Sequence, residues 1–140
     1  MHHKPQYRRK TIKGRHEKIY GGEYDIGGST FGNSGLNNGD NIPCAVCQST
    51  KGIQKLMIPG RVTCTRGWTR QYTGFLATQY GKGHVSSSQY ICMDSRPTAA
   101  DGGHRNDNGA LPYPVQAACG ALPCPKYRTG KTISCVVCTK

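Results

Sequence analysis

Long apolar runs are absent from this 140-residue chain, in which hydrophobic residues make up 35%. A transmembrane helix needs about 20 consecutive, mostly apolar residues, so the sequence predicts no membrane span. Residues Met1 to Lys18 are polar and basic and contain no apolar leader. If the protein is secreted, we expect a leader to have been removed or left out of this sequence.

Acidic residues are scarce, because 7 Asp and Glu stand against 19 Lys and Arg, which gives a net charge of +12. This excess favours a polyanionic partner such as a sulfated glycan, nucleic acid or an anionic matrix. Two histidines, His84 and His104, lie in glycine-rich loops with no glutamate and no serine motif such as G-x-S-x-G around them. We therefore do not expect an enzyme.

Cysteine, by contrast, is abundant. Eight cysteines in a small chain rich in loops indicate a disulfide framework and an oxidising compartment, so we predict a secreted, extracellular protein. In that compartment nucleic acid is not the expected partner, and any binding of it would follow from charge alone. We predict that all the cysteines form disulfides: Cys44, Cys47, Cys64, Cys92, Cys119, Cys124, Cys135 and Cys138.

Two similar cysteine pairs bracket the cysteine-bearing part of the chain. One lies in IPCAVCQSTK (Ile42 to Lys51) and the other in ISCVVCTK (Ile133 to Lys140). The four thiols have the spacing of a structural zinc site, but the four further cysteines favour two disulfide clips over zinc. A thioredoxin-like redox role would need a βαβ context, which the sequence does not contain. The pairing of the bridges stays open at this point.

Glycine and proline, 19 and 8 residues, favour short strands and many turns over long helices. The predicted fold is therefore β-rich, either all-β or α+β with little helix, in a small disulfide-stapled single domain. Strand-like runs of β-branched and aromatic residues are separated by Gly, Pro or Ser clusters. They are Cys44 to Cys47, Lys55 to Ile58, Arg61 to Cys64, Trp68 to Leu76, Tyr90 to Met93, Val115 to Cys119 and Thr132 to Val137.

Composition divides the chain into three parts. Residues 1–20 are predicted to form an extended basic arm, 21–41 a Gly-rich linker, and 42–140 the globular cysteine-rich domain. The arm has little to bury, so we expect it to be mobile unless a neighbouring subunit or a polyanion holds it. Its basic residues are Lys4, Arg8, Arg9, Lys10, Lys13, Arg15 and Lys18.

Two long polar loops, Tyr80 to Gln89 and Ser95 to Gly109, are candidate sugar-binding sites, because long loops on a rigid frame commonly carry binding residues. Sugars are held by hydrogen-bonding side chains and an aromatic face. Trp68, Tyr72, Tyr80, Tyr90 and Tyr113 are candidate platforms, although Trp68 also suits a small core. Calcium binding at 106–109 is a weaker alternative, since repeated acids are missing; no cofactor is expected. The candidate glycan-binding residues are His84, Gln89, Asp94, Arg105, Asn106, Asp107 and Asn108.

Three stretches carry a resemblance to a known family: PCAVCQSTKGIQKLMIPGRVTCTRGWTRQYTGFL (Pro43 to Leu76), QYICMD (Gln89 to Asp94) and CGALPCPKYRTGKTISCVVCTK (Cys119 to Lys140). Together they resemble the cysteine-rich non-collagenous domain of invertebrate short-chain collagens, to which a galactose-binding lectin of sea anemones is similar. The resemblance covers 43–140 and implies a secreted marine-invertebrate protein of extracellular matrix or attachment material. This chain has no Gly-X-Y repeat, and its first forty or so residues fall outside the shared pattern.

These features predict an extracellular structural protein that self-assembles into a homo-oligomer or fibre through its arm and binds extracellular glycans. The alternative is a soluble galactose-type lectin, in which the two polar loops hold a terminal sugar.

Overall fold

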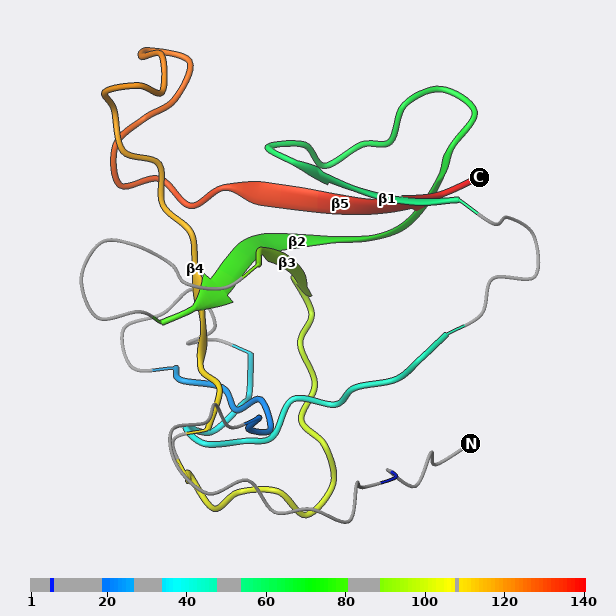
Figure 1. Cartoon of the computed structure of the whole chain (residues 1–140), viewed down its shortest axis with the longest axis vertical. Helices are drawn as coiled ribbons and strands as arrows, with labels where there is room; N and C mark the ends of the chain where they lie inside the picture. The colour runs from blue at the N-terminus through cyan, green and yellow to red at the C-terminus, as the bar shows by residue number, and fades with distance from the viewer. Residues whose placement is uncertain (1–5, 7–18, 27–33, 48–53, 81–88, 108) are drawn as a thin grey trace.

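The structure is a computed structural model, which describes residues 6, 19–26, 34–47, 54–80, 89–107 and 109–140. Five strands form one antiparallel sheet: β1 (Lys55–Pro59), β2 (Thr69–Gln79), β3 (Ile91–Asp94), β4 (Pro112–Pro114) and β5 (Ser134–Thr139). Figure 1 shows these strands joined by long connections, with no helix in the described parts of the chain. The protein is a small β-rich domain stapled by three disulfides, as the composition predicts. Within the described residues there is therefore no helix with the length and apolar character needed to cross a bilayer.

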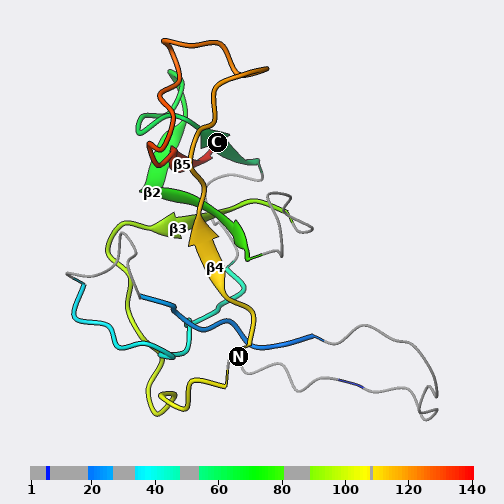
Figure 2. The same cartoon turned by 90° about the vertical axis from the view of Figure 1, so that its left-hand side faces the viewer.

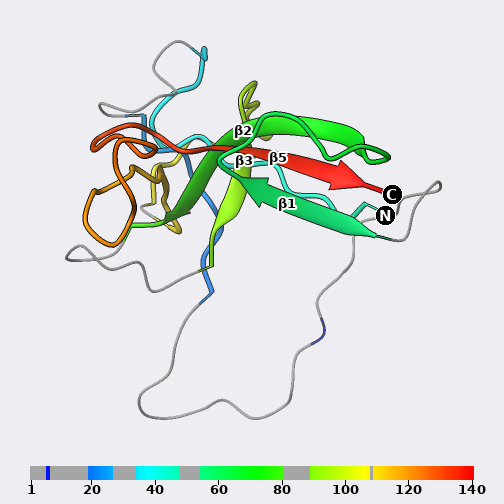
Figure 3. The same ribbon diagram turned by 90° about the horizontal axis from the view of Figure 1, so that it is seen from above.

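The strand order is β1-β5-β2-β3, with the last strand of the chain inserted between β1 and β2. Seen from above, β1, β5 and β2 lie side by side (Figure 3). The longest strand, β2, pairs with β5 through its first half, with β3 through Gly74 to Ala77 and with β4 at its end. Since three of the four strand pairings involve it and only β1 pairs elsewhere, with β5, β2 is the axis of the fold.

The C-terminal cysteines bridge outward from β5 rather than to each other. Cys135 bonds to Cys92 of β3, and Cys138 bonds to Cys64 in the connection between β1 and β2. Residues three apart in a strand point to opposite faces of the sheet, so these two thiols cannot meet. The predicted disulfide clip between Cys135 and Cys138 is therefore wrong. Because both cysteines are oxidised, they also cannot serve as thiolate ligands of the alternative zinc site.

The third bridge is local and exposed, and it joins Cys119 to Cys124. The two remaining cysteines, Cys44 and Cys47, are unpaired and exposed. The prediction that all eight cysteines form disulfides therefore holds for six of them within the chain, and the predicted clip at this first pair is absent.

The sheet is folded over β2 at Gly74. β3 and β5 flank β2, and strands two apart in a flat sheet are separated by roughly 10 Å. The Cα atoms of Cys92 and Cys135 are nevertheless only 5.7 Å apart. A Cβ atom at Gly74 would lie 1.6 Å from the carbonyl oxygen of Met93 in β3. Glycine at this position is therefore what allows the backbone of β3 to approach β2 so closely.

β4 was not expected, because two of its three residues are prolines. Pro cannot donate to a ladder and is confined to edges and to positions whose N–H would face away. The carbonyl of Leu111 accepts from Tyr80 N, and Val115 N donates to the carbonyl of Leu76. The odd-numbered residues thus bond to β2, while Pro112 and Pro114 occupy the alternate positions.

The other predicted strands divide into two groups. The runs at 55–58, 68–76, 90–93 and 132–137 coincide with β1, β2, β3 and β5 within a few residues. Residues 44–47 and 61–64 are not strands, and 115–119 contributes only isolated bridges at Gln116 and Cys119. A turn at 66–67, with Gly67 at φ 84°, follows the second of these runs.

Residues 21–26 and 34–41 pack against the sheet instead of linking two parts. Tyr24 is 4% exposed and forms a buried cluster with Ala77 of β2 and Met93 of β3, against which Ile26 and Leu36 also pack. These apolar side chains cover one face of the sheet, which the hydrophobic effect favours. The linker prediction is therefore wrong for the described part of 21–41, and Figure 2 shows this segment below the sheet, beside the loop at 95–107.

Candidate functional site

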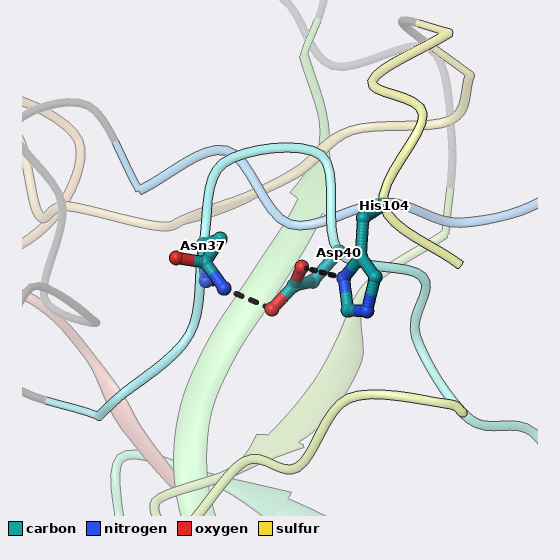
Figure 4. A network of polar contacts seen from close by, with 3 residues as sticks. All are labelled: Asn37, Asp40 and His104. Atoms are coloured by element: carbon teal, nitrogen blue, oxygen red, sulfur yellow. Dashed lines mark hydrogen bonds and ion pairs between the residues drawn. The ribbon is translucent and has the colours of Figure 1, made fainter. Parts of the chain in front are cut away.

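Two buried carboxylates lie where the segments 21–26 and 34–41 meet the long polar loop, described at 95–107 and 109. Asp40 is 2% exposed and Glu23 is 6% exposed. One Asp40 oxygen, Oδ2, accepts a 2.8 Å hydrogen bond from Asn37 N, and the other, Oδ1, lies 2.6 Å from Nδ1 of His104 (Figure 4). Asp40 thus joins a turn of the N-terminal segment to the loop.

Glu23 holds the end of the same loop. Its Oε1 accepts from Asp107 N at 3.2 Å, and its Oε2 accepts from Gly109 N at 3.3 Å. A buried carboxylate must be hydrogen-bonded, because burying an unpaired charge is costly. We call Glu23 and Asp40 the carboxylate clamp, since together they hold the loop at His104, Asp107 and Gly109.

The backbone adds to this attachment. Asn41 N donates to Gly103 O at 2.9 Å, Ala100 N donates to Asn41 O at 2.9 Å, and the Tyr24 hydroxyl donates to Thr98 O at 3.2 Å. The described part of the loop, 95–107, is therefore part of the folded domain, as a rigid binding loop would need to be.

The carboxylate clamp should make the loop sensitive to acid. The hydrogen bond from Asn37 N, followed by that from His104, lowers the pKa of Asp40 below its ordinary value of 3.8, and burial opposes this only in part. A carboxyl whose folded pKa is lowered stabilises the fold above its unfolded pKa, and this stabilisation is lost as pH falls through the folded pKa. We expect the unfolding free energy of Asp40→Asn to depend less on pH below about 4 than that of the wild type.

Denaturant unfolding at a series of pH values measures this difference. Asp101→Asn, at an exposed turn of the same loop, is the matched control and should keep the wild-type pH dependence. Parallel curves for Asp40→Asn and the wild type would show that the Asp40 carboxylate does not stabilise the loop.

The loop presents only some of the predicted sugar-binding residues together. Arg105, Asn106 and Asp107 are consecutive and exposed, and Arg105 Nε lies 3.4 Å from Asp107 Oδ2. Asn106 has φ 52°, a left-handed conformation that asparagine tolerates better than most residues. Their side chains are thus displayed on a backbone that the carboxylate clamp holds.

The other candidates are dispersed over the fold or lie outside its described residues. Asp94 ends β3, is half-buried and accepts a hydrogen bond from Arg96 N at 2.8 Å, while Gln89 is exposed before β3. His84 and Asn108 lie outside the described residues, as do the basic residues of the predicted arm at positions 4–18.

The candidate aromatic platforms have mixed environments. Tyr80 is 64% exposed, and its ring centroid lies 5.1 Å from that of Tyr113. The Tyr113 hydroxyl donates to the Asp25 carboxylate, and this hydrogen bond, with burial, raises the pKa of Tyr113 to about 12. Tyr72 is half-buried and donates to Cys92 O, and Tyr90 is exposed. Tyr80 and Tyr90 therefore have the accessible rings that a sugar platform requires.

A second surface, which the individual motifs did not predict, is defined by charge. The described segments 54–80 and 109–140 carry eight exposed Lys and Arg residues and no acid. All six acids of the described residues lie in 19–47 and 89–107, where only Arg96 and Arg105 are basic. We call the first surface the basic end: Lys55, Arg61, Arg66, Arg70, Lys126, Arg128, Lys131 and Lys140.

The fold brings these basic segments to one end of the molecule. In Figures 1 and 2, β1, β5 and the connections at 60–68 and 119–131 lie at one end, and 19–26, 34–47 and 95–107 lie at the other. Charges that are not paired with acids nearby reinforce one another over roughly the 8 Å Debye length of physiological salt. The sequence does contain a signal for this surface, because no acid occurs between Asp40 and Asp94 or after Asp107.

Sequence reasoning also missed the carboxylate clamp, since acids in a glycine-rich stretch look like solvated residues. The Asn-Gly-Asp turn that ends at Asp40 is the one local signal for it.

Metal sites do not occur among the described residues as groups of three or more His, Cys, Asp or Glu side chains. The calcium alternative at 106–109 thus gains no support from the residues whose positions are described.

No family model, curated protein or solved structure matches the chain. The resemblance to the short-chain collagen domain therefore stays a prediction from the sequence.

Proposed function

We propose that this protein is a non-enzymatic structural component of the extracellular matrix, which self-assembles and binds polyanionic glycans through its basic end. One observation supports the glycan part most strongly: eight exposed Lys and Arg residues share an end of the fold that has no described acid. Lysine and arginine bind sulfate and carboxylate groups by charge and by charge-assisted hydrogen bonds.

The disulfides favour a glycan over nucleic acid as the polyanion. Three bridges within one small domain are typical of proteins that fold in oxidising compartments and act outside the cell. Sulfated and carboxylated glycans are the abundant polyanions there, so the basic end has the right chemistry for that setting. Secretion and arm-mediated assembly are part of the same proposal.

Two double charge reversals of equal size test the glycan surface. Lys126→Glu with Arg128→Glu changes the basic end within an exposed connection, and Arg96→Glu with Arg105→Glu changes the opposite end. We expect the first double variant to bind immobilised heparin about tenfold more weakly than wild type at physiological salt, about 1.4 kcal/mol. The second should change affinity less than about twofold, because neither arginine belongs to the basic end and Arg105 lies in the loop at the opposite end.

Isothermal titration or surface plasmon resonance at several salt concentrations provides the measurement. Equal losses in both variants would mean that only net charge matters, and a loss confined to the Arg96 and Arg105 variant would place the glycan on the polar loop. A glycan-specific role would also be contradicted if the wild type bound a DNA duplex as tightly as heparin and if each double variant lost as much affinity for DNA as for heparin.

A galactose-type lectin is the second candidate, and the carboxylate clamp favours it. Glu23 and Asp40 hold the loop that displays Arg105, Asn106 and Asp107, as a preformed sugar site would require. Its ligand would be a neutral terminal sugar, and its binding would depend only weakly on salt.

A further inference from the structure

Cys44 and Cys47 are the cysteines that the fold does not use. The other six cysteines of the chain are joined in three bridges, so no thiol partner is left for this pair elsewhere in the chain. Both are exposed, although cysteine is among the most frequently buried residues. Two unpaired, exposed thiols are unusual in a domain that is otherwise fully oxidised.

The segment around them is apolar, uncharged and without described partners. Residues 43–47 read Pro-Cys-Ala-Val-Cys, and all five are exposed, with Val46 at 104%. The backbone is anchored just before them, where Ile42 N donates to Gly22 O at 2.9 Å and the Ile42 side chain packs on the core. No backbone hydrogen bond is described for residues 43–47. Figure 1 shows this stretch leaving the lower segments and running outside the sheet toward β1.

β5 shows what a very similar sequence does when partners are present. Cys-Val-Val-Cys at 135–138 lies between β1 and β2, is bonded on both edges, and sends one thiol to Cys92 and the other to Cys64. Cys-Ala-Val-Cys at 44–47 has the same spacing and the same small or β-branched residues between the thiols. An exposed apolar stretch whose backbone groups have no partner among the described residues is a surface onto which another chain can add.

We infer that Cys44 and Cys47 form disulfides to other copies of this chain. This inference rests on the assembly role proposed above and specifies its chemistry. A second copy supplies the same two thiols in equal number, and Ile42 to Cys47 carry no charge that would repel it, despite the net charge of +12. Two thiols per chain can link one copy to two others, so the cross-link can extend a filament.

The bond forms by thiol–disulfide exchange with a low-molecular-weight disulfide of the oxidising compartment. The thiol of Cys44 or Cys47 in one copy loses its proton, and the thiolate attacks the small disulfide and releases one small thiolate. A thiolate of the second copy then attacks the mixed disulfide and releases the second small thiolate. Two protein thiols are oxidised to one disulfide, and the small disulfide is reduced to two thiols, which take up the two protons.

Gel electrophoresis with and without reductant, together with intact mass, tests this on the full chain oxidised with a glutathione redox buffer. We expect the wild type to give dimers and larger species that reductant converts to monomer. Cys44→Ser and Cys47→Ser should each stop at the dimer, and the double variant should remain monomeric on the gel. Cys119→Ser with Cys124→Ser removes the other exposed cysteines and should leave the larger species in place, so it is the matched control.

Several results would overturn the inference. They are a monomer with a Cys44–Cys47 bridge, a monomer in which both thiols remain free to alkylation, and a dimer that a chelator but not a reductant dissociates. Light scattering of the wild type and of the Cys44→Ser, Cys47→Ser double variant separates the two proposals. If the wild type shows no reducible species but both proteins form a non-covalent oligomer, the cross-link is contradicted and the proposed assembly stands. If both proteins are monomers under all conditions, the cross-link and the assembly are both contradicted.

Discussion

Replacing Cys92 and Cys135 together by alanine is expected to lower the unfolding free energy by about 4 kcal/mol. The bridge closes a loop with a sequence separation of 43, and the chain-entropy relation gives roughly this value for a loop of that length. The bridge also ties β3 to β5 across β2, and Cys135 is 0% exposed. Its loss should therefore increase the conformational entropy of the unfolded chain, and it should also loosen the bend of the sheet at Gly74.

The matched comparison is Cys119→Ala with Cys124→Ala. That bridge has a sequence separation of only 5 and is exposed, so the same relation predicts a loss of about 2 kcal/mol. Denaturant unfolding followed by the fluorescence of Trp68, the one tryptophan of the chain, measures both variants. Equal losses in the two variants, or a larger loss for the local bridge, would contradict the central position of the Cys92–Cys135 bridge.

Gly74→Ala is expected to cost about 3 kcal/mol, at the upper end of what overpacking usually costs. The new Cβ would lie 1.6 Å from the carbonyl oxygen of Met93 and 2.5 Å from its carbonyl carbon. The neighbour is backbone held in β3 and tied by the bridge at Cys92, so it cannot rotate away as a side chain would. Either β3 separates from β2 or the bend at Gly74 opens, and both disturb the buried Met93.

Gly21→Ala is the control for this substitution, because a Cβ there would meet nothing within 4 Å. We expect its unfolding free energy to stay within about 0.5 kcal/mol of the wild type. A similarly small change for Gly74→Ala, measured by the same denaturant titration, would mean that β2 and β3 do not approach as closely as described.

The strands that coincide with runs of β-branched and aromatic residues could be predicted from the sequence. Their side-chain types favour a strand, and the Gly, Pro and Ser residues between the runs mark the strand ends. Trp68 to Leu76 and Thr132 to Val137 fall into this group, and they form the central pair β2 and β5. β4 could not be predicted, since its prolines are acceptable only because the alternate residues bond to β2. That condition depends on the tertiary arrangement.

The pairing of the cysteines was also beyond the sequence. Local spacing suggested that Cys135 would be close to Cys138, but a strand turns the two thiols to opposite faces. Their partners depend on the strand order β1-β5-β2-β3, which places β5 near both Cys64 and Cys92. The same spacing at Cys44 and Cys47 forms no bridge within the chain either, although that stretch lies outside the sheet.

The candidate site was only partly visible in the sequence. The polar loop at 95–109 was identified from its composition, whereas its attachment by Glu23 and Asp40 depends on contacts with residues more than sixty positions away. The basic end was hidden for a similar reason. The total charge of +12 shows an excess of base, but only the fold shows that the described acids other than Asp94 of β3 collect at the opposite end.

Locating a bound glycan on the full chain tests the proposed function most directly. The measurement is a titration of the isotope-labelled protein with a heparin oligosaccharide, followed by nitrogen–proton correlation spectra. The basic end predicts that the first and largest shifts occur within 54–70 and 119–140, with the loop at 104–107 unchanged. Shifts confined to 104–107, with 54–70 and 119–140 unchanged, would contradict the basic end as the glycan-binding surface and favour the lectin loop in its place.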